Sequence, residues 1–177
     1  MKIQLKKVAP EDVGFFLEKC HESFVQGVLD RFGDADAAPV PGNEVAQEIM
    51  DPACDVFFIT ADGAPAGGTV IRREEKKTYS LDLLFVFREF LNKKIGSGAW
   101  QAIEAQYPDA ERWETCTPYF ERRNIHFYLH KCGFKIVEFF SEFHREEHDL
   151  TDKFKDINTS GFFRFEKVMK PDELRRS

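Results

Sequence analysis

The sequence predicts a mixed α/β (α+β) fold in which helices flank a mostly antiparallel central sheet. Three apolar segments at 54–60, 67–72 and 79–86 follow one another with short turn-forming stretches between them, which is typical of antiparallel strands. Apolar residues recur at helical spacing both before and after this group, which indicates helices on either side of it in the chain. The length of 177 residues suits one domain with its own hydrophobic core.

The N-terminal part is expected to form a strand, a helix, a loop and a second helix. Ile3 and Leu5 alternate with polar residues, and Pro10 stands where the first turn of a helix tolerates proline. Residues 30–43 are rich in Asp, Ala, Pro and Gly and predict a loop, which a short helix at 44–50 follows. The apolar stripe of the first helix comprises Val13, Phe16, Leu17, Cys20, Phe24 and Val28.

The rest of the chain continues this alternation. Asp62-Gly63 is a hairpin signal, and the nearly continuous apolar run within 79–86 predicts a buried central strand. Gly133 stands where a helix ends on a left-handed residue. The later elements are a helix at 94–106, a strand at 112–117, a helix at 121–132 and closing strands at 134–143 and 161–169, with a loop or short helix at 145–160.

Domain organisation and charge exclude several classes of protein. Residues 1–170 are expected to form the single domain, with a polar tail at 171–177. The net charge is −6, and acidic neighbours offset the paired basic residues, so nucleic acid is not expected as a partner. No apolar run approaches the ~20 residues of a membrane span. Cys20, Cys54, Cys116 and Cys132 form no C-x-x-C pair, which favours reduced thiols in a cytoplasmic protein.

The segment 81–98, which joins the central strand to the next helix, carries the first functional signal. The strand leads into a turn that contains Gly96 and opens the helix. Unpaired N–H groups and the positive dipole end of such a helix form an anion site, and Lys93 and Lys94 add charge beside it. A phosphate-bearing ligand is therefore expected at this turn.

This turn resembles the acyl-CoA-binding motif of the GNAT superfamily of N-acyltransferases, Q/R-x-x-G-x-G/A, whose backbone amides hold the pyrophosphate of coenzyme A. The corresponding hexad is Leu91-Asn92-Lys93-Lys94-Ile95-Gly96. Gly96 matches the last position, whereas Leu91 replaces the Gln or Arg and Lys94 replaces the first Gly. We expect Lys94 to avoid the positive φ that a glycine would adopt there.

A second segment, 124–134, looks like the N-x-x-F/L-Y-x-x-x-G-F signature of the same superfamily. The resemblance implies a sheet of about seven strands and about four helices, splayed between strands four and five. The order of predicted elements is also that of the superfamily. The matching residues are Asn124, Phe127, Tyr128, Gly133 and Phe134.

The resemblance implies that acetyl-CoA binds mostly to main-chain groups. Its pantetheine arm would lie like an added strand along Leu84, Phe85 and Val86, where a backbone N–H would polarise the thioester carbonyl. Asn124 would touch the pantetheine or cap its helix, and Lys131 would reach the adenosine phosphate or face water. The pyrophosphate would lie on Leu91, Asn92, Lys93, Lys94, Ile95, Gly96 and Ser97.

Three residues are candidates for catalysis by the same resemblance. Tyr128, which also borders the cofactor, would donate a proton to the leaving thiolate, since a phenol with a pKa near 10 is protonated at neutral pH. The alternative is that its ring only packs against the sheet. Asp82 would accept the amine proton through water or orient the amine, and Glu114 on the fifth strand is the other candidate base.

Metal chemistry is not expected. His126 and His130 are one helical turn apart, as are His144 and His148, but paired ligands without convergent partners make no site. Cys132 lies on the apolar face of its helix and is interpreted as a small buried hydrophobe.

The predicted function is transfer of an acetyl group from acetyl-CoA to a primary amine of an unidentified small molecule or peptide, by direct attack. The alternative is a non-catalytic GNAT-like module that binds acyl-CoA or a protein partner. No membrane partner is expected, and the protein would be a monomer or a homodimer.

Overall fold

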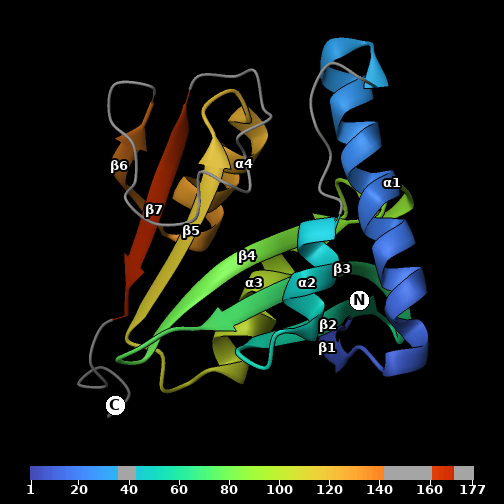
Figure 1. The fold of residues 1–177 in the computed structure, drawn as a ribbon, viewed down its shortest axis with the longest axis horizontal. Helices are drawn as coiled ribbons and strands as arrows, with labels where there is room; N and C mark the ends of the chain where they lie inside the picture. The colour runs from blue at the N-terminus through green and yellow to red at the C-terminus, as the bar shows by residue number, and fades with distance from the viewer. Residues whose placement is uncertain (36–42, 142–160, 170–177) are drawn as a thin grey trace.

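The computed structural model describes residues 1–35, 43–141 and 161–169. Within them, seven strands form one sheet in the order β1-β2-β3-β4-β5-β7-β6 (Figure 1). Every neighbouring pair is antiparallel except β4 and β5, which are parallel. The predicted fold class and order of elements are confirmed. The strands are β1 (Ile3–Lys7), β2 (Cys54–Ala61), β3 (Ala64–Arg73), β4 (Thr78–Val86), β5 (Arg112–Pro118), β6 (Lys135–Phe140) and β7 (Phe162–Val168), and the helices are α1 (Val13–Phe32), α2 (Asn43–Met50), α3 (Ile95–Gln106) and α4 (Arg122–Phe127).

Several boundaries differ from the predicted ones. Residues 30–32, expected in a loop, form the last turn of α1, because the stop signal is Gly33, which has φ +74° and donates its N–H to the Leu29 carbonyl. The helix predicted at 121–132 is α4 followed by a π-helical turn, η4 (Tyr128–Cys132), which ends at left-handed Gly133 as predicted. The closing strands are shorter than expected. The segment predicted at 145–160, the tail, His144 and His148 lie outside the described residues.

Tight turns connect β2, β3 and β4 into two successive hairpins. Asp62 and Gly63 both have positive φ, at 50° and 89°, which is the type I′ geometry that matches strand twist. The second turn uses Lys76 and Lys77, also at positive φ. These turns confirm the antiparallel succession that the sequence predicted.

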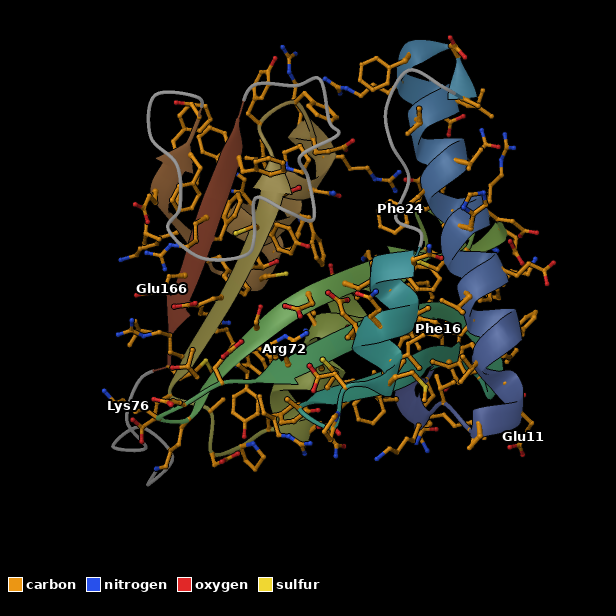
Figure 2. The ribbon with its side chains drawn as sticks, viewed as in Figure 1. Glu11, Phe16, Phe24, Arg72, Lys76 and Glu166 are labelled. Atoms are coloured by element: carbon orange, nitrogen blue, oxygen red, sulfur yellow. The ribbon has the colours of Figure 1, made fainter. Side chains whose placement is uncertain are left out.

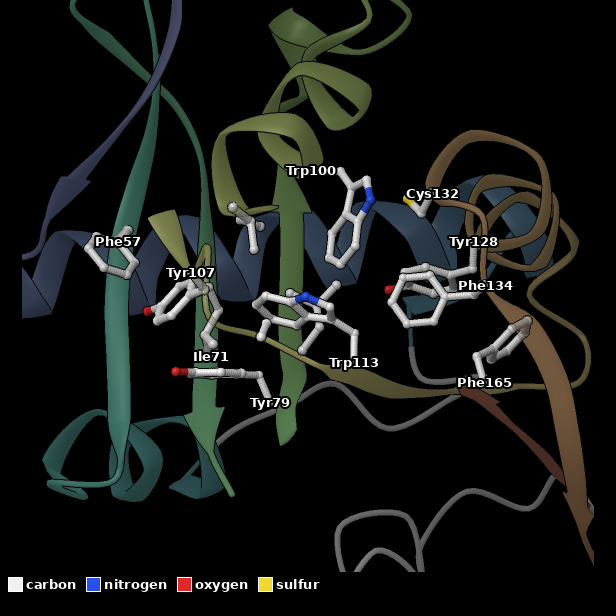
Figure 3. Packing of buried hydrophobic residues seen from close by; sticks show 13 residues of the cluster. Phe57, Ile71, Tyr79, Trp100, Tyr107, Trp113, Tyr128, Cys132, Phe134 and Phe165 are labelled. Carbon is white, nitrogen blue, oxygen red and sulfur yellow. The ribbon is translucent and has the colours of Figure 1, made fainter. Parts of the chain in front are cut away.

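Aromatic residues fill both faces of the sheet. On the face that α3 and η4 cover, Trp100 and Trp113 meet edge to face with ring centroids 5.2 Å apart, beside Tyr128 and Phe165 (Figure 3). On the opposite face, Phe16 of α1 packs within a second cluster beneath α1 and α2. In the described part of the chain, no helix has both the length and the apolar character needed to cross a bilayer.

Candidate active site

The sheet divides between its two parallel strands. β4 and β5 pair only at Thr78–Ser80 against Arg112–Glu114, and both strands then continue in diverging directions (Figure 1). The Thr115 hydroxyl donates to the Leu81 carbonyl at 2.9 Å across the start of the divergence. Leu84, Phe85 and Val86 of β4 pair with β3 on one side. The pairing of β4 with β5 on the other side ends at Ser80, before these three residues. The predicted splay between the fourth and fifth strands is confirmed.

A β-bulge in β4 lies beside this division. Val70 of β3 faces Leu83 while Ile71 faces Leu81, so Asp82 is an extra residue in β4. The bulge changes which face the strand presents, because Leu81 packs in the cluster beneath α3 and Leu83 in the one beneath α1. It therefore places Asp82 where β4 changes faces.

The turn before α3 has the open geometry expected of an anion site. The Gly98 N–H bonds the Lys94 carbonyl at 3.1 Å, so the N–H groups of Ile95, Gly96 and Ser97 precede the first bond of the helix. No side chain in the described residues caps this helix end. Lys93 and Lys94 are exposed beside it. The turn can thus offer several N–H donors and positive charge to a phosphate.

The expectation that Lys94 avoids positive φ is wrong. Lys94 has φ +61° and ψ 17°, and Asn92 has φ +63°. The chain keeps the left-handed turn that glycine would favour, at a cost of roughly 1–2 kcal/mol for a residue with a Cβ. Asn tolerates this region better than most residues, and Lys94 is exposed, which leaves its side chain room. The replacement of glycine by Lys94 therefore leaves the left-handed turn intact.

α4 contacts this turn at two points. An ideal Cβ on Gly96 would lie 3.2 Å from Cε2 of Phe127, so the missing side chain at Gly96 admits the Phe127 ring. Arg123 donates to the Asn92 side-chain oxygen at 3.4 Å, which brings a third cation to the turn. The Gly96–Phe127 contact joins the two motifs identified in the sequence, and Arg123 lies one residue before the second motif.

Tyr128 is buried at the point where the strands diverge. Its ring packs with Phe134 and Phe165. Burial raises the pKa of the Tyr128 phenol, and the Thr115 hydroxyl opposes that rise only in part. The phenol is therefore protonated throughout the neutral range and can act as a proton donor but not as a base.

Arg72 holds Asp82, the first candidate base, in an ion pair on the face of the sheet where α2 lies (Figure 2). The Asp82 side chain is only 5% exposed and accepts from Arg72 Nε at 3.0 Å and from the Ser80 hydroxyl at 2.5 Å. Arg72 also pairs with Asp51 at 2.6 Å. Burial lowers the pKa of Arg72, but hydrogen bonds to Asp51 and Asp82 outweigh it, so the pKa is raised.

Glu114, the second candidate base, is also paired with an arginine. It lies opposite Ser80 in the β4–β5 register and interacts with Arg164 at 3.4 Å, while Arg164 also contacts Glu138 at 3.2 Å. Both candidate bases thus share the neighbourhood of one end of the β4–β5 pairing.

Asn124 and Lys131 have simpler surroundings. Asn124 does not cap α4, because Glu121 is the N-cap residue and the Asn124 amide instead donates to the Thr117 hydroxyl at 3.5 Å. That contact directs it toward the end of β5. Lys131 is exposed on η4.

The histidines and cysteines form no metal site in the parts of the chain that the structure describes. The His126 and His130 rings lie 4.7 Å apart, and no further ligand from the described residues gathers around them. No disulfide links any of the four cysteines, all of which lie in the described residues. Cys132 is buried as predicted, and burial raises its pKa to about 12, although Lys167 opposes the rise. It is therefore a packing residue at neutral pH.

Sequence reasoning misses two residues of this region. Arg72 belongs to a run of mixed charges whose members are expected to offset one another, but its partners are Asp51 and Asp82. Side chains alternate between the two faces of a strand, so Arg72 shares a face with Val70, two residues earlier. That spacing could have indicated that Arg72 points toward the buried side. Nothing local in the sequence indicates the bond from the Thr115 hydroxyl to the Leu81 carbonyl.

Comparison with known proteins agrees with this geometry. Residues 21–134 match the family model described as "Acetyltransferase (GNAT) family". The Bacillus subtilis (strain 168) protein YrkN, described as uncharacterized, is 43% identical over 175 residues, covering 96% of this chain and 95% of that protein.

Solved acetyltransferases share the fold over nearly the whole chain. An acetyltransferase from Thermus thermophilus has a TM-score of 0.67 at 15% identity, covering 96% of this chain and 98% of that one. A Bacillus subtilis acetyltransferase in complex with CoA has a TM-score of 0.63 at 19% identity, covering 96% and 99%. The family model confirms the acetyltransferase class that the sequence predicted. The chain belongs to the GNAT acetyltransferase family.

Proposed function

We propose that this protein transfers an acetyl group from acetyl-CoA to a primary amine, by direct attack of the amine on the thioester carbon. The observation that supports this most is the conjunction of an uncapped α3 N-terminus with the diverging edge of β4. The first suits a pyrophosphate and the second suits the amides of a pantetheine arm. The departures at Leu91 and Lys94 favour a non-catalytic module when read from the sequence, but the left-handed turn is retained despite them.

Different groups around the site would act at different steps of this reaction. In the attack the amine nitrogen bonds the carbonyl carbon, the C–S bond breaks, and the sulfur leaves as a thiolate. Tyr128 would give its phenolic proton to that sulfur and regain one from solvent afterwards. Main-chain N–H groups of Leu84, Phe85 or Val86 would stabilise the oxyanion. The amine loses its own proton to water.

We further propose that Asp82 orients the amine rather than deprotonating it. The Arg72 ion pair and the Ser80 hydroxyl hold the Asp82 carboxylate in one position, from which it could accept hydrogen bonds from an ammonium group. Glu114 is paired with Arg164 in the same way, and its side chain, 30% exposed, is the more accessible of the two. An amine-bearing cation is therefore the expected acceptor class.

The test begins with calorimetric titration by acetyl-CoA, with NADH as the comparison ligand, followed by thiol release with a panel of amines. Tyr128→Phe should lower kcat by tenfold or more and leave the Kd for acetyl-CoA nearly unchanged. Tyr79→Phe is the matched control, because it also removes a buried tyrosine hydroxyl, one that bonds Asp109 instead. Equal rates for Tyr128→Phe and wild type would remove Tyr128 from the role of acid. Absence of acetyl-CoA binding would refute the proposed function itself.

A further inference from the structure

The divergence of β4 and β5 raises the question of what fixes the spacing of their separated ends. Their pairing ends at Ser80 and Glu114. A strand-like ligand needs about 4.8 Å to each neighbouring strand. Some other element must therefore hold the ends at a suitable separation before the ligand arrives.

The end of β4 is tied to α1. Arg88, two residues past the strand, donates to the Gln26 side-chain oxygen at 2.7 Å. The Gln26 amide in turn donates to Asp30 at 2.6 Å, one helical turn further on. Phe87 also meets Phe15 of α1 edge to face, with ring centroids 6.4 Å apart.

The end of β5 is tied to the same helix. Phe120, two residues past β5, meets Phe32 edge to face with ring centroids 5.7 Å apart. The Arg31 guanidinium lies 5.2 Å from the centre of the Phe120 ring and 5.5 Å from that of Phe32. The edge-to-face contact and the shared guanidinium both favour one relative orientation of the Phe32 and Phe120 rings.

One continuous helix thus connects both ends. α1 runs without interruption from Val13 to Phe32, and buried Phe16 and Cys20 anchor its first half on the sheet. Gln26 and Phe32 are six residues apart, or about 9 Å along a helix axis. We propose that the segment Gln26–Phe32 is a strut that sets the distance between the diverging ends of β4 and β5, so that Arg31, Phe32 and Phe120 are positioning residues for the cofactor.

The inference rests on the proposed function, because a preset separation matters only if a ligand binds between the strands. A strut that orders the site in advance improves affinity by reducing the ordering that binding requires. Its loss should therefore weaken acetyl-CoA binding although none of the three residues needs to touch the ligand.

The experiment compares Phe32→Ala with Phe139→Ala. Both rings are 42% exposed, so neither truncation should prevent folding, but Phe139 lies on β6 and packs on Phe163. Phe32→Ala should weaken acetyl-CoA binding about five- to tenfold in calorimetry. Phe139→Ala should change it less than twofold. Phe120→Tyr, which keeps a ring for Arg31, should bind like wild type.

Hydrogen exchange separates the strut from the proposed function. In ligand-free Phe32→Ala, amides at the end of β5 should exchange faster than in wild type, while those of β2 stay unchanged. Unchanged affinity, or an equal loss in Phe139→Ala, would overturn the strut. If wild type does not bind acetyl-CoA, the proposed function fails. In that case the strut is tested separately, because unchanged amide exchange at the end of β5 in Phe32→Ala would refute it.

Discussion

Lys94 gives the most direct test of the geometry assigned to the phosphate-binding turn. Its φ of +61° belongs to the left-handed region, where a residue with a Cβ costs roughly 1–2 kcal/mol and glycine costs little. Lys94→Gly and Lys94→Ala remove the same ammonium group, but only the alanine keeps the strain. Glycine also loses more backbone entropy on folding, which offsets roughly 0.5–1 kcal/mol. We therefore expect Lys94→Gly to be more stable than Lys94→Ala by about 1 kcal/mol.

Urea denaturation of both variants at pH 7 measures this difference directly, and it corresponds to a Tm gap of roughly 2–4 °C for a domain of this size. Lys93 is the matched control, because it is the adjacent exposed lysine and does not have positive φ. At position 93 the order of stabilities should be reversed, with Lys93→Ala more stable than Lys93→Gly by about 0.4–1 kcal/mol. If glycine is the less stable substitution at both positions, Lys94 does not adopt the left-handed turn.

Two further predictions concern the neighbouring contacts. Gly96→Val should lower stability by about 1–3 kcal/mol and weaken acetyl-CoA binding, because its side chain would press on the Phe127 ring; adding Phe127→Leu should restore part of the stability, and strictly additive losses would exclude that ring as the cause. For Glu121, burial raises the pKa above its ordinary value of 4.5, although Arg31 opposes the rise. The stabilisation from holding its proton is present below pH 4.5 and is lost as the pH rises through the folded pKa. The unfolding free energy of wild type minus that of Glu121→Gln should therefore fall as pH increases from about 4 and then level off, and a rise would contradict the direction of the shift.

Elements defined by local pattern could be predicted from the sequence. The alternation of Ile3 and Leu5, the hairpin at Asp62-Gly63 and the left-handed end at Gly133 each depend on a few neighbouring residues, and the structure confirms all three. Trp113, in the strand predicted at 112–117, is fully buried. Periodicity and turn chemistry are local properties, so one sequence is enough to identify them.

The features that give the site its character depend on contacts between distant segments. The bulge at Asp82 is defined by the register of β3 against β4, and no single strand reveals it. The pairing of Arg72 with Asp51 and Asp82 joins residues that are separated by 21 and 10 positions. Lys94 could not be predicted for a different reason. The conformational preference of a lysine is against positive φ, but the surrounding turn imposes a positive φ on Lys94. Tertiary context outweighs a local preference of roughly 1–2 kcal/mol.

Charge is divided between the two sides of the proposed site in a way that matches its two substrates. The turn before α3 gathers Lys93, Lys94 and Arg123 around the positive end of a helix, where an anionic cofactor would be held. Arg72 and Arg164 each lie between two carboxylates, and these acidic clusters would attract a cationic amine. The same arginines fix the positions of those carboxylates, which suits them to hold the ammonium group of an amine. We infer that the deprotonation needed for attack depends on the amine and solvent, and that the protein contributes position, an oxyanion donor and the proton of Tyr128.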